Sequence, residues 1–61
     1  MKRSALIRHL SEHGCELVRE GGRHSIWRNT NNGELTAIPR HSEIKELMAL
    51  KICKDLRVKL P

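Results

Sequence analysis

Histidine is the residue type in this chain best suited to chemistry, and it occurs four times, as His9, His13, His24 and His41. A histidine ring ordinarily titrates between about pH 5 and 8, so it can accept or donate a proton, and it also binds metals. His9 and His13 are four residues apart, the spacing of a zinc-binding pair on a helix. No third ligand and no His-Glu-x-x-His pattern accompanies them. We therefore expect both rings on a solvated face, and no metal site.

His24 directly follows Gly21, Gly22 and Arg23, a sequence typical of a turn. The two glycines leave the backbone bare, so that a phosphate group could approach closely, and Arg23 could hold that phosphate. The alternative interpretation, which position alone favours, is a partly buried histidine in a hairpin.

His41 follows Pro39 and Arg40, where the second predicted helix begins. Free backbone N–H groups and the helix dipole favour an anion at such a helix end. The alternative role for His41 is that of a capping or turn residue.

Several other kinds of site are excluded by what the sequence lacks. It contains no phosphate-binding GxxxxGK loop, no GxSxG motif and no pair of CxxC motifs. Trp27 is the only aromatic residue apart from the histidines, so the base-stacking surfaces of RRM and OB domains cannot be built. The carboxylates that could bind magnesium are dispersed, as Glu12, Glu16, Glu20, Glu34, Glu43, Glu46 and Asp55. A catalytic site would therefore use histidine.

The size and charge of the chain suggest a polymeric, anionic partner. Its 61 residues make one domain, too small to enclose a deep pocket, and 12 Lys and Arg against 7 Asp and Glu give a net charge of +5. Nucleic acid is the commonest target of such a charge, the alternative being a merely soluble basic domain. A membrane surface is less favoured because the basic residues are scattered.

The cysteines and the first residues indicate a cytoplasmic protein. Cys15 and Cys53 are far apart in the sequence, so we expect reduced thiols that serve as small packing residues. After Met1 the chain runs Lys2-Arg3-Ser4, and we expect neither a signal peptide nor an apolar run long enough to span a membrane.

Hydrophobic periodicity predicts five elements. A helix over 4–13 has Ser4 as its N-cap and ends at Gly14, which suits a left-handed residue. Strands are predicted over 15–19, 24–29 and 34–38, and Pro39 is expected to stop the third one. The Gly21–Gly22 pair and the polar run that ends at Asn32–Gly33 mark the two turns between the strands.

The last predicted helix begins near Ser42, its expected cap. Its apolar stripe consists of residues that recur every three or four positions, namely Ile44, Leu47, Met48, Ile52, Cys53 and Leu56. Two helices on one face of a three-stranded antiparallel sheet would bury both stripes. The predicted fold is therefore α+β with the order α-β-β-β-α, similar to the double-stranded RNA-binding domain.

Four segments resemble the HicA family of toxins. The segment over 17–27, LVREGGRHSIW, resembles the family's strand–turn–strand with Gly-Ser-His, and Ile38-Pro39-Arg40-His41 resembles its apolar-Pro-x-His. The segments over 43–46 and 52–54 resemble its closing helix, so that the similarity extends over residues 3–58. The chain departs from the family at Arg23, where a small residue is usual, and over 47–49, where Leu-Met-Ala replaces Gly-Thr-Leu.

This resemblance implies an endoribonuclease that cleaves messenger RNA, and a HicB-type antitoxin that covers its active face. The family's catalytic histidine falls on His24. We expect RNA contacts from Lys2, Arg3, Arg23, Arg40 and His41. No cofactor is expected, and the free protein is expected to be a monomer or weak dimer. Trp27 is a candidate apolar contact for the antitoxin.

Two alternatives remain at this point. One is a non-catalytic RNA-binding module of the same fold, in which His24 only binds a phosphate. The other is a DNA-binding regulator, which is less favoured because the strands separate the two helices and leave no helix-turn-helix.

Overall fold

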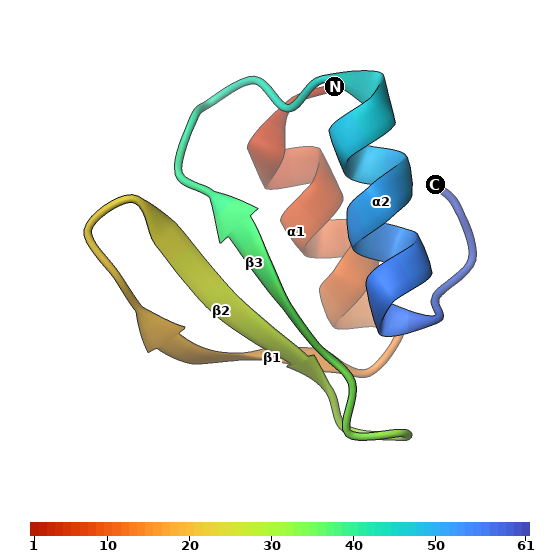
Figure 1. The fold of residues 1–61 in the computed structure, drawn as a ribbon. Helices are drawn as coiled ribbons and strands as arrows, with labels where there is room; N and C mark the ends of the chain where they lie inside the picture. The colour runs from red at the N-terminus through yellow and green to blue at the C-terminus, as the bar shows by residue number, and fades with distance from the viewer.

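A computed structural model describes all 61 residues and shows two helices packed on one face of a three-stranded antiparallel sheet (Figure 1). The elements are α1 (Arg3–Glu12), β1 (Cys15–Glu20), β2 (His24–Asn29), β3 (Leu35–Pro39) and α2 (Glu46–Leu56). The strands lie in sequence order, with β2 in the middle. This arrangement confirms the predicted fold class.

The core lies between the helices and the sheet. Ten buried apolar residues form it: Leu6, Leu10, Cys15, Trp27, Ile38, Ile44, Ala49, Ile52, Cys53 and Leu56. Both cysteines are free thiols inside this cluster, which confirms their predicted packing role. Trp27 is only 8% exposed, so it belongs to the protein's own core, and the expectation that it could meet a partner is wrong.

The predicted caps of both helices are wrong, and α2 begins later than predicted. An isolated antiparallel bridge holds residues 1–3 against residues 42–44, with hydrogen bonds of 2.8 Å from Arg3 N to Ser42 O and from Ile44 N to Met1 O. The bridge pairs Lys2 with Glu43, and this extended backbone cannot also be helical. Consequently α2 begins only after Lys45, later than predicted, whereas α1 begins at Arg3, one residue before its predicted cap. Neither Ser4 nor Ser42 caps a helix.

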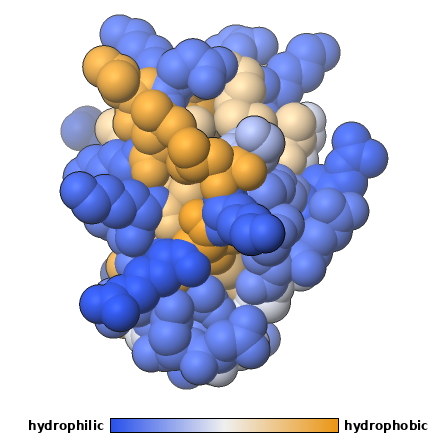
Figure 2. All heavy atoms as spheres, turned by 90° about the vertical axis from the view of Figure 1, so that its right-hand side faces the viewer, coloured by the Kyte–Doolittle hydropathy of each residue, from blue (hydrophilic) through white to orange (hydrophobic).

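The delayed start of α2 changes the residues that it buries. Its core face consists of Ala49, Ile52, Cys53 and Leu56, whereas Leu47 is 80% exposed, which corrects its predicted place in the apolar stripe. Seen from the side of α2 and the C-terminal segment, the surface carries a band of apolar side chains among hydrophilic ones (Figure 2). Neither helix has the length and apolarity needed to cross a bilayer.

The third strand runs one residue further than predicted. Pro39 is its last residue and pairs with His24 of β2. Because β3 is an edge strand, the N–H that proline lacks would not bond another strand there.

A bulge in β1 determines which of its side chains face the helices. Leu17 pairs with Trp27 and Arg19 pairs with Ile26, so Val18 has no partner in β2. This extra residue shifts the alternation, and Glu20 therefore comes opposite the buried Ser25.

The His9 and His13 rings are half-buried and pack against each other, with their centroids 4.3 Å apart. His9 Nε2 lies 2.6 Å from Lys59 O, which holds the C-terminal segment against α1. The expectation of two solvated rings is therefore wrong.

Candidate active site

His24 is the first residue of β2 and is exposed at one end of the sheet. The strand alternation buries Ser25, Trp27 and Asn29, so His24 lies on the face of the sheet away from the helices. No hydrogen bond of the structure engages its ring nitrogens. The imidazole is therefore free to meet a ligand from solvent, and the alternative of a partly buried hairpin histidine does not hold.

The turn before His24 has a tightly packed backbone. Gly21 N donates a 2.8 Å hydrogen bond to His24 O, and a Cβ atom at Gly21 would lie only 2.7 Å from that oxygen. Any larger residue at position 21 would push the turn open. A Cβ atom at Gly22, by contrast, would meet nothing within 4 Å. The bare backbone predicted beside His24 is thus present at Gly22.

A buried hydroxyl next to His24 connects three elements. Arg3 of α1 donates from its guanidinium to Ser25 Oγ and to Pro39 O, both at 2.8 Å. Ser25 Oγ in turn donates a short hydrogen bond to the Glu20 carboxylate at the end of β1. Ser25 has no exposed surface. These bonds fix the start of β2, and with it His24, relative to α1 and to the ends of β1 and β3.

Arg40 extends the same set of contacts to the turn. Its guanidinium donates to Gly21 O at 3.0 Å and lies 3.6 Å from the Glu20 carboxylate. Its backbone N–H donates to Arg23 O at 3.2 Å. The loop that carries His41 is therefore joined to the turn that carries His24.

Sequence reasoning missed Ser25 and Glu20. The alternation of β2 placed Ser25 on the same face as Trp27, and a polar residue on a buried face was the available signal. Glu20 gave no such signal, because its position opposite Ser25 depends on the bulge at Val18.

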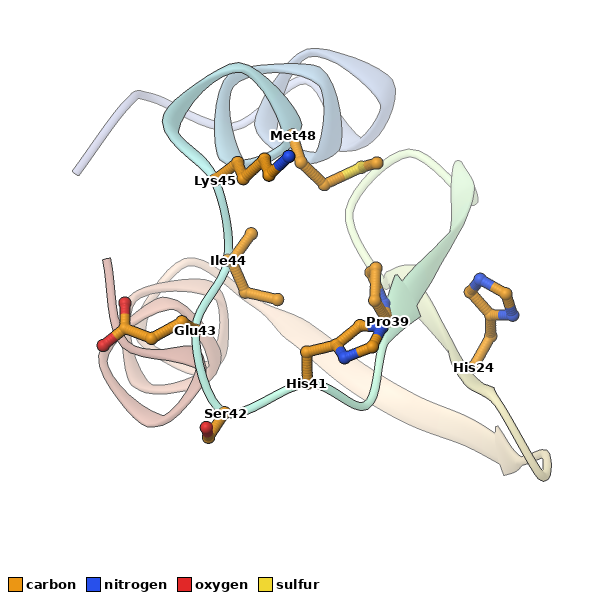
Figure 3. A pocket seen from close by; sticks show the side chains of 8 residues that line it. All are labelled: His24, Pro39, His41, Ser42, Glu43, Ile44, Lys45 and Met48. Atoms are coloured by element: carbon orange, nitrogen blue, oxygen red, sulfur yellow. The ribbon is translucent and has the colours of Figure 1, made fainter.

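His24 and His41 border the same two hollows. The first, here called the turn hollow, is lined by Gly22, Arg23, His24, Arg40 and His41. The second, the β3–α2 hollow, is lined by His24, Pro39, His41, Ser42, Glu43, Ile44, Lys45 and Met48 (Figure 3). Both are open to solvent, as expected for so short a chain.

The charge around the turn hollow is positive. Arg23 is exposed, and no hydrogen bond or ion pair engages its side chain. Arg40 keeps about half of its side chain exposed despite its contact with Glu20. In the neighbouring β3–α2 hollow, the Glu43 carboxylate points away, toward α1 (Figure 3), and lies 3.7 Å from the N-terminal ammonium group. The two hollows thus suit an anion.

The structure brings most of the predicted site residues together, but not all of them. Arg23, Arg40 and His41 line the turn hollow with His24. Arg3 reaches the site only through its bonds to Ser25 and Pro39. Lys2 is exposed and lines a separate hollow with Arg3, Ser4, Ser42 and Glu43.

The site is equipped for proton transfer and for holding a phosphate. Burial raises the pKa of the Cys15 and Cys53 thiols above the ordinary value, so they are not available as thiolate nucleophiles. No cluster of three or more His, Cys, Asp and Glu side chains is placed to hold a metal ion. Two exposed imidazoles and two arginines remain as the candidate reactive and anion-binding groups.

The comparisons with known proteins identify one family. Residues 3–58 match the family model described as "HicA toxin of bacterial toxin-antitoxin". The comparisons with curated proteins and with solved structures gave no match.

Proposed function

The chain belongs to the HicA family of bacterial toxins from toxin–antitoxin systems, and from this premise we propose that it is an endoribonuclease that cleaves messenger RNA with His24 as general base. The observation that carries the proposal is the position of His24. Its ring is exposed at a rigid turn and borders, with His41, a hollow that also contains Arg23 and Arg40. RNA supplies the nucleophile of this reaction, its 2′-hydroxyl.

In the proposed reaction, the neutral His24 ring takes the proton of the 2′-hydroxyl while O2′ attacks the adjacent phosphorus. The bond from phosphorus to the 5′-oxygen breaks, and that oxygen receives a proton from His41. The products are a 2′,3′-cyclic phosphate and a 5′-hydroxyl. Arg23 and Arg40 stabilise the additional negative charge on the phosphoryl oxygens in the transition state.

The bound RNA would extend from this site over the basic surface. The net charge of +5 favours binding of the RNA phosphate backbone. The exposed Lys2 pairs in the bridge with Glu43, which lines the β3–α2 hollow, so Lys2 lies next to the site. We propose contacts from Lys2 at this periphery, while Arg3 contributes mainly by positioning Ser25 and Pro39.

The protein partner in this proposal is a HicB-type antitoxin that acts in the same cytoplasm. It would cover the turn hollow and compete with RNA for a positive surface, so its docking face should be rich in acidic residues.

The test is cleavage of labelled RNA by His24→Ala in a buffer that contains EDTA, since the scheme needs no metal. Loss of the base is expected to lower the rate roughly 10²- to 10⁴-fold, with unfolding temperature and RNA affinity nearly unchanged because the ring is exposed. His13→Gln, a histidine substitution outside both hollows, is the control and should keep the wild-type rate.

Cleavage by His24→Ala at the wild-type rate would remove the proposed role of this ring, and wild-type activity that depends strictly on magnesium would contradict the scheme. A wild-type protein that shifts RNA in a gel without cleaving it would support the alternative, a non-catalytic RNA-binding module.

A further inference from the structure

The β3–α2 hollow continues the site beyond the groups that the proposed cleavage uses. Its volume is about 550 Å³, within the range of roughly 300–1,000 Å³ that is usual for small-ligand sites. Pro39, Ile44 and Met48 supply apolar surface, while His41 and Lys45 supply hydrogen-bond donors. The lining is therefore amphipathic, unlike that of the turn hollow, which has no apolar residue.

The apolar wall is accessible rather than part of the closed core. Ile44 is 3% exposed and belongs to the core cluster, but Met48 keeps 39% of its surface exposed. Figure 3 shows the Met48 side chain extending from the start of α2 toward the side of the hollow where Pro39 ends β3. Exposed apolar surface beside polar groups is typical of a ligand-binding site.

We propose that the β3–α2 hollow binds the unpaired nucleobase of a nucleotide that adjoins the cleaved phosphate, an inference that rests on the proposed ribonuclease function. A nucleobase has two apolar ring faces and a polar edge, which matches the lining. Met48 and Pro39 contact the ring, and the Met48 sulfur is suited to an aromatic partner. Lys45 donates to acceptor atoms on the base edge.

The β3–α2 hollow adjoins the proposed cleavage site, and this favours a nucleobase of the same RNA as its ligand. His24 and His41 line both hollows, so a phosphate held between Arg23 and Arg40 leaves the base of the same or the next nucleotide at the β3–α2 hollow. The base must be unpaired, because a base inside a duplex is stacked and cannot enter. Apart from the histidine rings, the protein has no exposed aromatic ring for stacking, since Trp27 is buried. The Met48 wall takes that role.

The test compares Met48→Ala with Leu47→Ala, the matched control. Both residues lie in the first turn of α2, but only Met48 lines the hollow, and Leu47 is 80% exposed. The substrates are oligonucleotides with 2′-O-methyl groups at all sugars but one, so that cleavage occurs at one bond. Each is made with a base, or as an abasic form, on either side of that bond.

We expect removal of one of the two bases to raise the KM of the wild type roughly three- to tenfold, the range of a sulfur–aromatic contact. Met48→Ala should show a clearly smaller difference in KM with and without that base, because only the contacts from Pro39 and Lys45 remain. Leu47→Ala should keep the wild-type difference, and Met48→Leu should restore the part that comes from apolar contact but not the part that comes from the sulfur. Unfolding temperatures of the variants confirm that each one is folded.

The inference is overturned if neither base affects KM, or if Met48→Ala and Leu47→Ala respond alike, even though RNA is cleaved. If the wild type cleaves no RNA, the ribonuclease proposal fails by itself. The hollow is then tested by fluorescence anisotropy with fully 2′-O-methylated oligonucleotides, for which the same base dependence of affinity on Met48 is expected, and its absence refutes the site.

Discussion

At the scale of single residues, the two adjacent glycines before His24 have different functions. Gly21 is packed against His24 O, whereas Gly22 faces open space. Gly21 therefore maintains the shape of the turn, and Gly22 leaves room in front of the histidine. A sequence pattern cannot separate these roles, because both positions read as the same residue in the same turn.

We expect Gly21→Ala to lower both stability and the cleavage rate, because the new methyl group would lie 2.7 Å from a backbone oxygen. Such overpacking typically costs about 1–3 kcal/mol. Gly22→Ala is the control, and it should leave stability unchanged or raise it by a few tenths of a kcal/mol or more, as glycine replacement does at compatible sites. Denaturant titration and RNA cleavage of the two variants measure the difference. Equal effects would contradict the assigned roles.

Ser25 is the residue on which the placement of His24 most depends. Its hydroxyl both accepts from Arg3 and donates to Glu20, so removing it takes one hydrogen bond from each of two charged groups at a buried position. Ser25→Ala is therefore expected to cost about 1–3 kcal/mol of unfolding free energy. For a domain of this size, 1 kcal/mol corresponds to roughly 4–8 °C in unfolding temperature.

Calorimetry measures this loss, and Ser4→Ala serves as control because Ser4 is exposed and its side chain makes no hydrogen bond. An unfolding temperature of Ser25→Ala equal to that of Ser4→Ala would show that the buried hydroxyl does not stabilise the protein.

At the scale of secondary structure, periodicity predicted the existence and order of every element but not where the helices begin. The turn at Gly14 was predicted correctly, and its φ of +84° is the left-handed conformation that glycine favours. The late start of α2 depends on the bridge that pairs Lys2 with Glu43. Segments some forty residues apart in the chain form that bridge, so no local pattern reveals it.

One side chain of α2 connects this helix to the edge strand. Asp55 accepts hydrogen bonds from Lys51 Nζ at 2.8 Å and from Thr36 Oγ1 of β3 at 3.1 Å. These bonds hold the pKa of the Asp55 carboxyl below its ordinary value of 3.8. The folded protein thus binds this proton less tightly than the unfolded chain does, and stability rises with pH through the acidic range.

The stabilising contribution of Asp55 is expected to be complete above about pH 5 and to be lost as pH falls below 3.8. The stability difference between wild type and Asp55→Asn, measured by denaturant titration from pH 2 to 7, should therefore shrink toward the acid end. Glu12→Gln, which removes an exposed carboxylate that forms no salt bridge, should show a much flatter difference. A pH-independent difference for Asp55→Asn would refute the linkage.

At the scale of the whole molecule, a small core supports an open site. Only 13 of 61 residues are buried, which is consistent with the marginal stability of domains of this size. The candidate site residues His24, Arg23, Arg40 and His41 lie at the end of the sheet, outside the core, so they can be substituted without unfolding the protein. The family similarity, rather than any physical pattern, indicated which of the four histidines is the candidate catalytic base. Position in the sequence alone favoured a partly buried hairpin histidine at His24.

The two core thiols can report on the integrity of the whole fold. The pKa of Cys15 is raised by burial and by the neighbouring Cys53, and burial raises that of Cys53. Because the thiolate is the nucleophile, we expect iodoacetamide to modify neither cysteine in the native protein near neutral pH. Modification should begin with global unfolding, as mass spectrometry across a urea series would show. Fast labelling of one cysteine in the native state would mean that the core opens locally.

Because Val18 has no partner in β2, the β1–β2 hairpin could lose this residue without a change of register. If Val18 were deleted, the pairs Leu17–Trp27 and Glu20–Ser25 could both persist in a regular ladder, because Val18 has no partner and is 53% exposed. A family member shorter by one residue at this point could therefore keep the same histidine in the same place. Sequence alignments across this hairpin should accordingly admit a single-residue gap before the glycines without any change of assigned site.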